Sequence, residues 1–130
     1  MKQKNKKTIQ GKDISFNRIA LENKNTETLI LSHTNKHDRL NQRDSGLNQV
    51  LCKIALENNI TLAIDMKELS ETKDKKSKAI ILSRIIQNIK LIKKYKNKFK
   101  LINYKNKEQA FSFLLSLGLP TNLAKKATEK

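Results

Sequence analysis

The chain has 130 residues, of which 28 are basic and 12 acidic, so its formal net charge is +16 at pH 7. Its length suits one domain, and its 37% of hydrophobic residues can fill a core, which argues against a wholly disordered chain. No apolar run could cross a membrane, and no apolar stretch typical of a secretory signal follows Met1. The single cysteine, Cys52, excludes internal disulfides and cysteine-based metal clusters. We therefore expect a cytoplasmic protein whose partner is a polyanion.

The excess of positive charge points to nucleic acid. Lysine outnumbers arginine 24 to 4, a preference that the codon bias of an AT-rich genome can produce. Such bias explains the choice of Lys over Arg, but it does not explain the surplus of bases over acids. A surplus of this size attracts nucleic acid or an anionic membrane surface, and counterion release adds affinity. Lysine favours contacts with backbone phosphates over bidentate reading of bases.

The first third of the chain predicts two strands around one helix. Residues 1–7 form a basic tail, residues 8–10 a short strand, and the apolar spacing from Ile14 to Asn23 predicts a helix capped by Asp13. The compact apolar run at 28–31 is typical of a strand that is covered on both faces. A long polar loop follows from Ser32 to Gly46, and loops of this length favour a functional role.

The remaining elements continue the alternation of strands and helices. Asp44 or Ser45 is expected to cap the next helix, Asn58-Asn59 ends it, and Gly118 ends the second-last helix. In the long helix, the expected buried stripe consists of Leu82, Ile85, Ile86, Ile89 and Ile92. The predicted elements are a helix from 47 to about 57, a strand at 60–66, a charged connection at 67–76, a long helix at 77–95, a strand at 99–103, a helix at 107–117 and a short helix after Pro120.

This order defines the expected fold class. Strands that alternate with helices of this length imply parallel βαβ units with right-handed crossovers. Four strands are too few to close a barrel, so an open sheet or a fragment of a larger (β/α) barrel is expected. No repeat and no linker divides the chain, which predicts one α/β domain over residues 8–130.

Familiar catalytic signatures are absent from the sequence. The three glycines stand alone, so neither a P-loop nor a dinucleotide fingerprint is present. His33 and His37 have the spacing of helical metal ligands but lie in a loop, where two exposed histidines are the simpler interpretation. Asp65 follows a strand, as catalytic carboxylates of α/β folds often do, and Cys52 fits a small, inert helix residue.

A group of basic residues around the long loop and two strand ends is the positive feature. The group contains three of the four arginines, and an arginine that persists in a lysine-rich chain suggests a need for guanidinium geometry. We expect this group to contact RNA phosphates. Its members are Arg39, Arg43, Lys53, Lys67, Lys78 and Arg84.

Several linked segments occur in order along residues 8–128. They are Asn17-Arg18 with Ala20-Leu21-Glu22-Asn23, Leu31-Ser32-His33, Arg43-Asp44-Ser45-Gly46 through Asn58-Asn59-Ile60, Met66-Lys67-Glu68-Leu69, the long helix with Arg84 and Asn88, and Leu114 to Pro120 followed by Ala124-Lys125-Lys126-Ala127. Together these segments resemble the ribonuclease P protein component 3 family of archaea, which has eukaryotic relatives. The sequence departs from the family pattern at Asn48-Gln49, where Asp-His is usual, and at Lys67 and Glu68, where Arg and Pro are usual.

The resemblance implies a fold and a function. The family resembles a TIM-like barrel, so this shorter chain is expected to form a partial barrel that lacks the opening βα units. A partner protein, a second copy or RNA would then cover the open edge. The implied function is that of a ribonuclease P subunit, which binds the catalytic RNA and supports removal of 5′ leaders from precursor tRNA. The RNA would use Mg²⁺, while the chain would hold no metal, cofactor or catalytic residue.

The resemblance also implies partners: ribonuclease P RNA, precursor tRNA and other protein subunits, especially the component 2 type, with no membrane. Two alternatives remain open at this point. One is a stand-alone, metal-dependent phosphoesterase or nuclease that uses His33, His37 and Asp65. The other is a truncated remnant without function.

Overall fold

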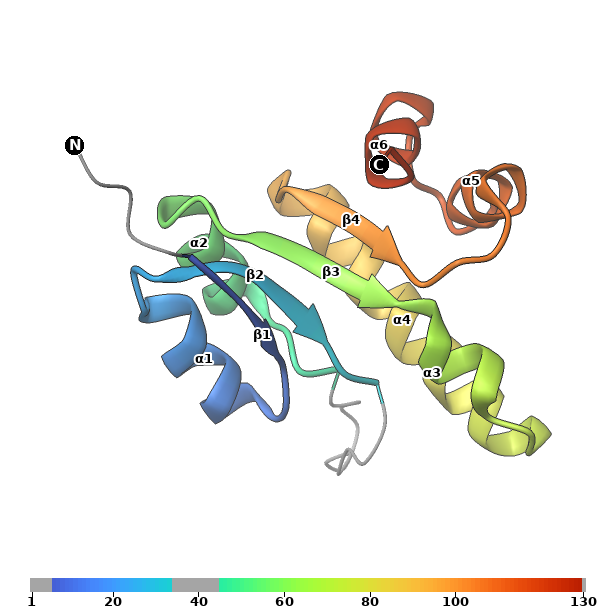
Figure 1. Ribbon diagram of the computed structural model, residues 1–130, viewed down its shortest axis with the longest axis horizontal. Helices are drawn as coiled ribbons and strands as arrows, with labels where there is room; N and C mark the ends of the chain where they lie inside the picture. Colours follow the sequence, from blue (N-terminus) through green and yellow to red (C-terminus); the bar gives the residue numbers. More distant parts are fainter. Residues whose placement is uncertain (1–5, 34–44, 130) are drawn as a thin grey trace.

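The computed structural model of the chain describes residues 6–33 and 45–129. Four parallel strands form one sheet, and helical segments follow each strand (Figure 1). All predicted strands and helices are present, with ends that differ from the prediction by a few residues at most. In chain order the elements are β1 Lys7–Gln10, α1 Ile14–Glu22, β2 Thr26–Leu31, α2 Gln49–Glu57, β3 Thr61–Asp65, α3 Met66–Glu71, α4 Lys75–Tyr95, β4 Phe99–Ile102, α5 Lys107–Ser116 and α6 Thr121–Ala127.

The order of the strands distinguishes a barrel-like sheet from a doubly wound one. The spatial order is β1-β2-β3-β4, so every crossover moves one position in the same direction. Helices α1, α2 and α4 contact one another in that order. A doubly wound sheet reverses its direction and places helices on both faces, whereas a (β/α) barrel does not. The predicted α/β class, an open portion of a (β/α) barrel, is confirmed.

The core lies around the two central strands. Leu29 and Leu31 on β2, and Leu62 and Ile64 on β3, are completely buried, as the continuous apolar runs predict. Helix α4 covers them with a stripe that is rotated slightly from the predicted one, since Ile81 is buried where Leu82 and Ile86 are only half-buried. The fully buried residues of that stripe are Ile81, Ile85, Ile89 and Ile92.

Two local predictions are wrong. The segment expected to be a charged connection contains helix α3, because the Asp65 side chain accepts the Lys67 N–H at 2.9 Å and caps a helix there. Helix α2 is capped by Asn48, whose Oδ1 accepts the Leu51 N–H at 2.9 Å, and not by Ser45, while Asp44, the other expected cap, lies outside the described residues. Ser45 is instead buried, and its hydroxyl donates to the Leu47 carbonyl.

Asn17 holds the beginning of α1 against the segment that precedes α2. Its Oδ1 accepts the Lys12 N–H at 2.8 Å, and its Nδ2 donates to the Gly46 carbonyl at 2.7 Å. Gly11 makes this packing possible, because a Cβ there would lie 2.5 Å from the Ile30 carbonyl oxygen and 2.9 Å from Asn17 Oδ1. The expected tail of residues 1–7 falls outside the described residues except for its last two, and Lys7 already belongs to β1.

Candidate nucleic-acid interface

Four of the six basic residues that the sequence singled out are described by the structure, and they lie on three helices. Lys53 on α2, Lys67 in the first turn of α3 and Lys78 near the start of α4 are all exposed. Arg39 and Arg43 lie outside the described residues. Arg84 differs from the lysines, since it is only 6% exposed and its Nη1 donates to the His33 carbonyl at 3.3 Å. Its guanidinium thus takes part in an internal contact, and a contact with RNA remains a prediction for the group as a whole.

Arg84 belongs to a buried polar network at the carboxyl edge of the sheet. His33, expected to be exposed, is 0% exposed, because it lies two residues after the end of β2 and is covered there by residues of α3 and α4. Its backbone N–H donates to Glu68 Oε1 at 3.0 Å, and its Nδ1 lies 3.1 Å from the same oxygen. On the other side, Asn88 Nδ2 lies 2.9 Å from His33 Nε2 and donates to the Ser45 carbonyl at 3.0 Å.

These contacts determine the ionisation of Glu68. An ionised carboxylate can only accept, so the His33 ring donates to Glu68 from Nδ1. Burial raises the pKa of Glu68, but hydrogen bonds from the His33 ring and backbone, the His33 charge and the Ser32 hydroxyl together lower that pKa below its ordinary value of 4.5. Glu68 is therefore ionised at neutral pH, and it fixes the end of β2 to α3.

The structure does not assemble the residues of the nuclease alternative. His33 faces Glu68 and Asn88, whereas Asp65 accepts hydrogen bonds from the Lys67 N–H and from Asn103 Nδ2, both at 2.9 Å. The third member, His37, lies outside the described residues. In the part of the chain that the structure describes, no group of three His, Cys, Asp or Glu side chains is arranged to hold a metal ion. In the same part, no helix has the length and apolar character of a membrane span.

The distribution of charge along the chain indicates a surface that the sequence reasoning missed. Residues 1–74 contain 13 basic and ten acidic side chains, whereas residues 75–130 contain 15 basic and two acidic ones. Residues 75–107, which include α4 and β4, contain 12 basic side chains and no acid. Counting charge by segment, rather than over the whole chain, reveals this asymmetry directly from the sequence.

Part of this charge gathers around one hollow at the amino end of β4. The hollow has a volume of about 330 Å³, and three lysines from two places in the fold line it: Lys96 and Lys98 in the connection between α4 and β4, and Lys126 on α6. All three are exposed, and no acidic residue is among the described residues that line the hollow. We call this site the basic hollow. In Figure 1, α6 lies beside β4, to which it is joined by direct contacts.

Lysines in the last turn of a helix have a structural explanation, because they complement the helix dipole. This explanation applies to Lys93, Lys94 and the C-cap Lys96 at the end of α4, and to Lys126 in the last turn of α6, but not to Lys98. Lys96 also adopts a left-handed backbone conformation with φ 56°. Three exposed lysines around one hollow, with no acid among the described residues that line it, are typical of a phosphate-binding surface.

Fold and surface together define an α/β protein, a portion of a (β/α) barrel, with a strongly basic surface around its last strand. No family model matches the chain. It is similar to curated proteins named ribonuclease P protein component 3 from archaea. The relative from Methanococcoides burtonii is 43% identical over 61 residues, which cover 47% of this chain and 22% of that protein. The relatives from Methanococcus vannielii and Methanosarcina acetivorans are 31% and 34% identical over 87 residues, which cover 67% of this chain and 35% and 33% of those proteins.

A solved structure agrees with these relatives. A chain in the cryo-EM structure of archaeal ribonuclease P with mature tRNA matches with a TM-score of 0.74 and 25% identity, covering 95% of this chain and 53% of that chain. The resemblance to ribonuclease P protein component 3 is therefore confirmed. The chain spans between about a fifth and a third of the length of the curated relatives that it matches.

Proposed function

We propose that the chain is a protein subunit of ribonuclease P, which binds the catalytic RNA and supports removal of 5′ leaders from precursor tRNA. Two observations together support this proposal. The chain is similar to component 3, and residues 75–107, which include α4 and β4, contain 12 basic side chains and no acidic one. Either feature alone fits other functions, because many proteins of other function are basic and because a fold does not determine a function.

The proposed mechanism is electrostatic. A folded RNA brings phosphates close together, and a basic protein surface lowers their mutual repulsion while counterions are released. The RNA then reaches its compact, active form at a lower concentration of Mg²⁺. In this proposal the RNA and its Mg²⁺ perform the phosphodiester hydrolysis, and the chain binds no cofactor of its own. Precursor tRNA and other protein subunits, the component 2 type above all, are the proposed partners of the assembled enzyme in the cytoplasm.

The proposal is tested by binding and by reconstitution. The purified chain is titrated into an archaeal ribonuclease P RNA, and cleavage of precursor tRNA is then measured over a range of Mg²⁺ concentrations. We expect the chain to bind the RNA with a strong dependence on salt and to shift half-maximal cleavage to a lower Mg²⁺ concentration. Binding that is no tighter than to an unrelated RNA of the same length, with no shift in Mg²⁺ dependence, would refute the proposal.

A pair of variants with equal change in charge locates the interface. The first replaces the three lysines of the basic hollow, Lys96, Lys98 and Lys126, by alanine. The control replaces three exposed lysines from the less basic half of the chain, Lys6, Lys7 and Lys24. We expect the first variant to lose about 1–3 kcal/mol of binding free energy and the control much less. Equal losses would show that only the overall charge matters.

A cleavage assay without ribonuclease P RNA tests the alternative function. Purified chain is incubated with precursor tRNA and Mn²⁺ or Zn²⁺ in the absence of ribonuclease P RNA. Cleavage under these conditions would favour a stand-alone nuclease. The geometry gives no support to that outcome, since His33 and Asp65 each have other partners.

A further inference from the structure

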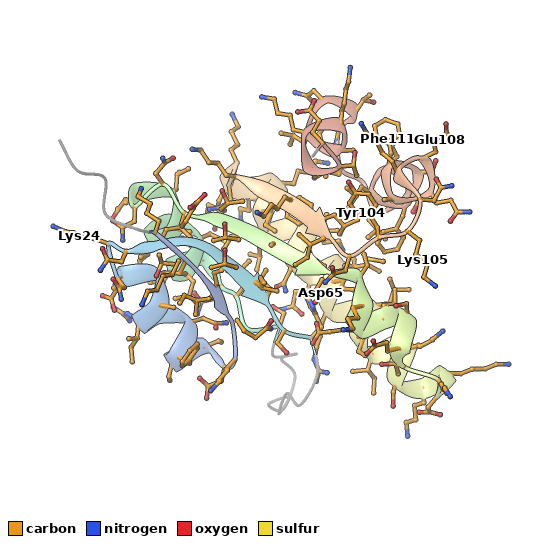
Figure 2. All side chains as sticks on the ribbon, viewed as in Figure 1. Lys24, Asp65, Tyr104, Lys105, Glu108 and Phe111 are labelled. Carbon is orange, nitrogen blue, oxygen red and sulfur yellow. The ribbon has the colours of Figure 1, made fainter. Side chains whose placement is uncertain are left out.

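A second cleft lies at the other end of β4, on the carboxyl edge of the sheet. It has a volume of about 410 Å³, within the range of small-ligand sites, and α3, α4, β4 and α5 all contribute to it. Figure 2 shows Tyr104 and Lys105 at the end of β4, between the sheet and α5. In (β/α) barrels, binding sites lie at the carboxyl ends of the strands. The position is therefore one at which this class of fold places binding sites.

The lining of the cleft has two kinds of surface. Its apolar part includes Leu69 from α3 and Phe113 from α5, both half-buried. Its polar part includes two exposed lysines, Lys78 from α4 and Lys105 from the loop after β4, and the exposed amide side chain of Gln109. No acidic residue is among the described residues that line the cleft. An apolar, aromatic interior with cations at its rim matches a flat, apolar group attached to negative charges.

The aromatic wall is held in place before anything binds. Tyr104 follows β4, and its hydroxyl donates to the Thr128 carbonyl, after α6, at 2.7 Å. The preceding residue, Asn103, has a left-handed backbone conformation with φ 58°, and its amide donates to Asp65. Both ends of this short loop are thus fixed, one to the end of β3 and one to the end of the last helix. A ring that is already ordered loses little entropy when a partner stacks on it.

We propose that this cleft receives one unpaired nucleobase of the bound RNA, stacked against Tyr104 and Phe113, with the flanking phosphates on Lys78 and Lys105. This inference rests on the proposed function, because it takes the polyanion to be RNA. Proteins recognise unpaired RNA bases by aromatic stacking and by polar contacts with the base edges, whereas a paired base is not available to a cleft of this kind. The amide of Gln109 is placed to contact the edge of such a base.

Tyrosine fluorescence provides a direct test, because the chain has two tyrosines and no tryptophan. The variant Tyr95→Phe leaves Tyr104 as the only emitter. Its fluorescence lifetime is measured as the protein is titrated with a short single-stranded oligoadenylate, and again with the same strand paired to oligouridylate. We expect the single strand to shorten the lifetime of Tyr104 in a saturable way, and the duplex to bind without this effect.

Substitutions in the cleft provide a second, independent readout. Phe113→Leu keeps an apolar side chain but removes the aromatic face, and we expect it to weaken single-strand binding by about five-fold or more and duplex binding hardly at all. Lys78→Ala with Lys105→Ala should reduce the slope of log K against log salt concentration by about 1.4, which corresponds to two phosphate contacts on a single strand. Lys7→Ala with Lys24→Ala is the matched control, and Figure 2 shows Lys24 at the opposite end of the molecule from Lys105.

The outcomes separate this inference from the proposed function. If the chain binds RNA but the lifetime of Tyr104 does not change and the cleft variants bind like the control, the cleft inference is overturned while RNA binding stands. Cleft variants that bind RNA normally but lose a component 2 type subunit would overturn it in favour of a protein occupant. If the unmodified chain binds no RNA at all, both the proposed function and the inference fail.

Discussion

Glu68→Ala should lower the free energy of unfolding by about 2–4 kcal/mol at pH 7. The Glu68 carboxylate accepts the Ser32 hydroxyl and the His33 N–H at 3.0 Å each, and it lies 3.1 Å from the His33 ring nitrogen Nδ1. Because His33 is completely buried, the alanine variant leaves two of its N–H groups without a partner, and each such donor costs about 1–3 kcal/mol. The expected loss lies in the lower part of their sum, since the Glu68 side chain is 17% exposed and water can enter.

Glu68→Gln is the matched control for shape. The glutamine retains one acceptor oxygen for His33 but has no charge, so we expect a smaller loss of about 1 kcal/mol. The two proteins should also differ in their response to acid. Because the hydrogen bonds outweigh burial, the pKa of Glu68 is lower in the folded state than the ordinary 4.5. Its contribution is therefore complete above the unfolded pKa and is lost as the pH falls through the folded pKa.

Urea unfolding followed by far-ultraviolet circular dichroism, from pH 7 down to about pH 3, measures both effects. We expect the wild type to lose part of its advantage over Glu68→Gln below the ordinary glutamate pKa, because the variant lacks this titration. An alanine variant as stable as the wild type, or a constant difference between wild type and Glu68→Gln over the whole pH range, would refute the assigned role of this carboxylate.

Three other predictions concern the thiol, two glycines and one buried amide. The Cys52 thiol should react with a maleimide only after unfolding, because burial raises its pKa to about 12 and leaves it without exposed surface; rapid labelling of the native protein would contradict this. Gly11→Ala should cost about 1–3 kcal/mol through its clash with the Ile30 carbonyl, and Gly118→Ala about 1 kcal/mol through strain at φ +95° in open space, as measured by urea unfolding. Asn17→Leu should cost about 2–4 kcal/mol, because the Lys12 N–H and the Gly46 carbonyl lose their hydrogen bonds with the Asn17 side chain, and equal stability of this variant would exclude the bridging role.

Much of the fold could be predicted because it depends on local patterns. The apolar runs that become β2 and β3 are largely buried, although Ile30 is only half-buried, and the spacing of apolar residues from Leu82 to Ile92 predicts a long covered helix. The helix α3 was missed because its sequence is charged and it is only six residues long. The side chain of Asp65 caps the beginning of this helix, whereas the sequence pattern indicated that Asp65 could be a catalytic carboxylate.

The polar network could not be predicted because its members are distant in sequence. The polar sequence around His33 predicts a histidine in an exposed loop. Its burial depends on α3 and α4, which begin more than thirty residues later. Arg84 illustrates the same limit. Its persistence in a lysine-rich chain indicated a need for a guanidinium, and the contact that the structure describes is with the His33 carbonyl. Retention of an arginine therefore does not by itself distinguish an external partner from an internal one.

The two proposed contact regions lie at opposite ends of the same short strand. The basic hollow lies at the amino end of β4, with Lys98, and the cleft lies at its carboxyl end, with Tyr104. The six residues from Lys98 to Asn103 span about 16 Å in extended form. Within this span Lys98 and Lys100 are exposed, whereas Leu101 is buried, so the segment presents two positive charges while it remains part of the core. Under the two proposals, a single RNA strand that follows β4 meets phosphate contacts first and a base site last. The proposals together then predict that salt dependence arises along the whole path, whereas the preference for unpaired bases arises at its carboxyl end.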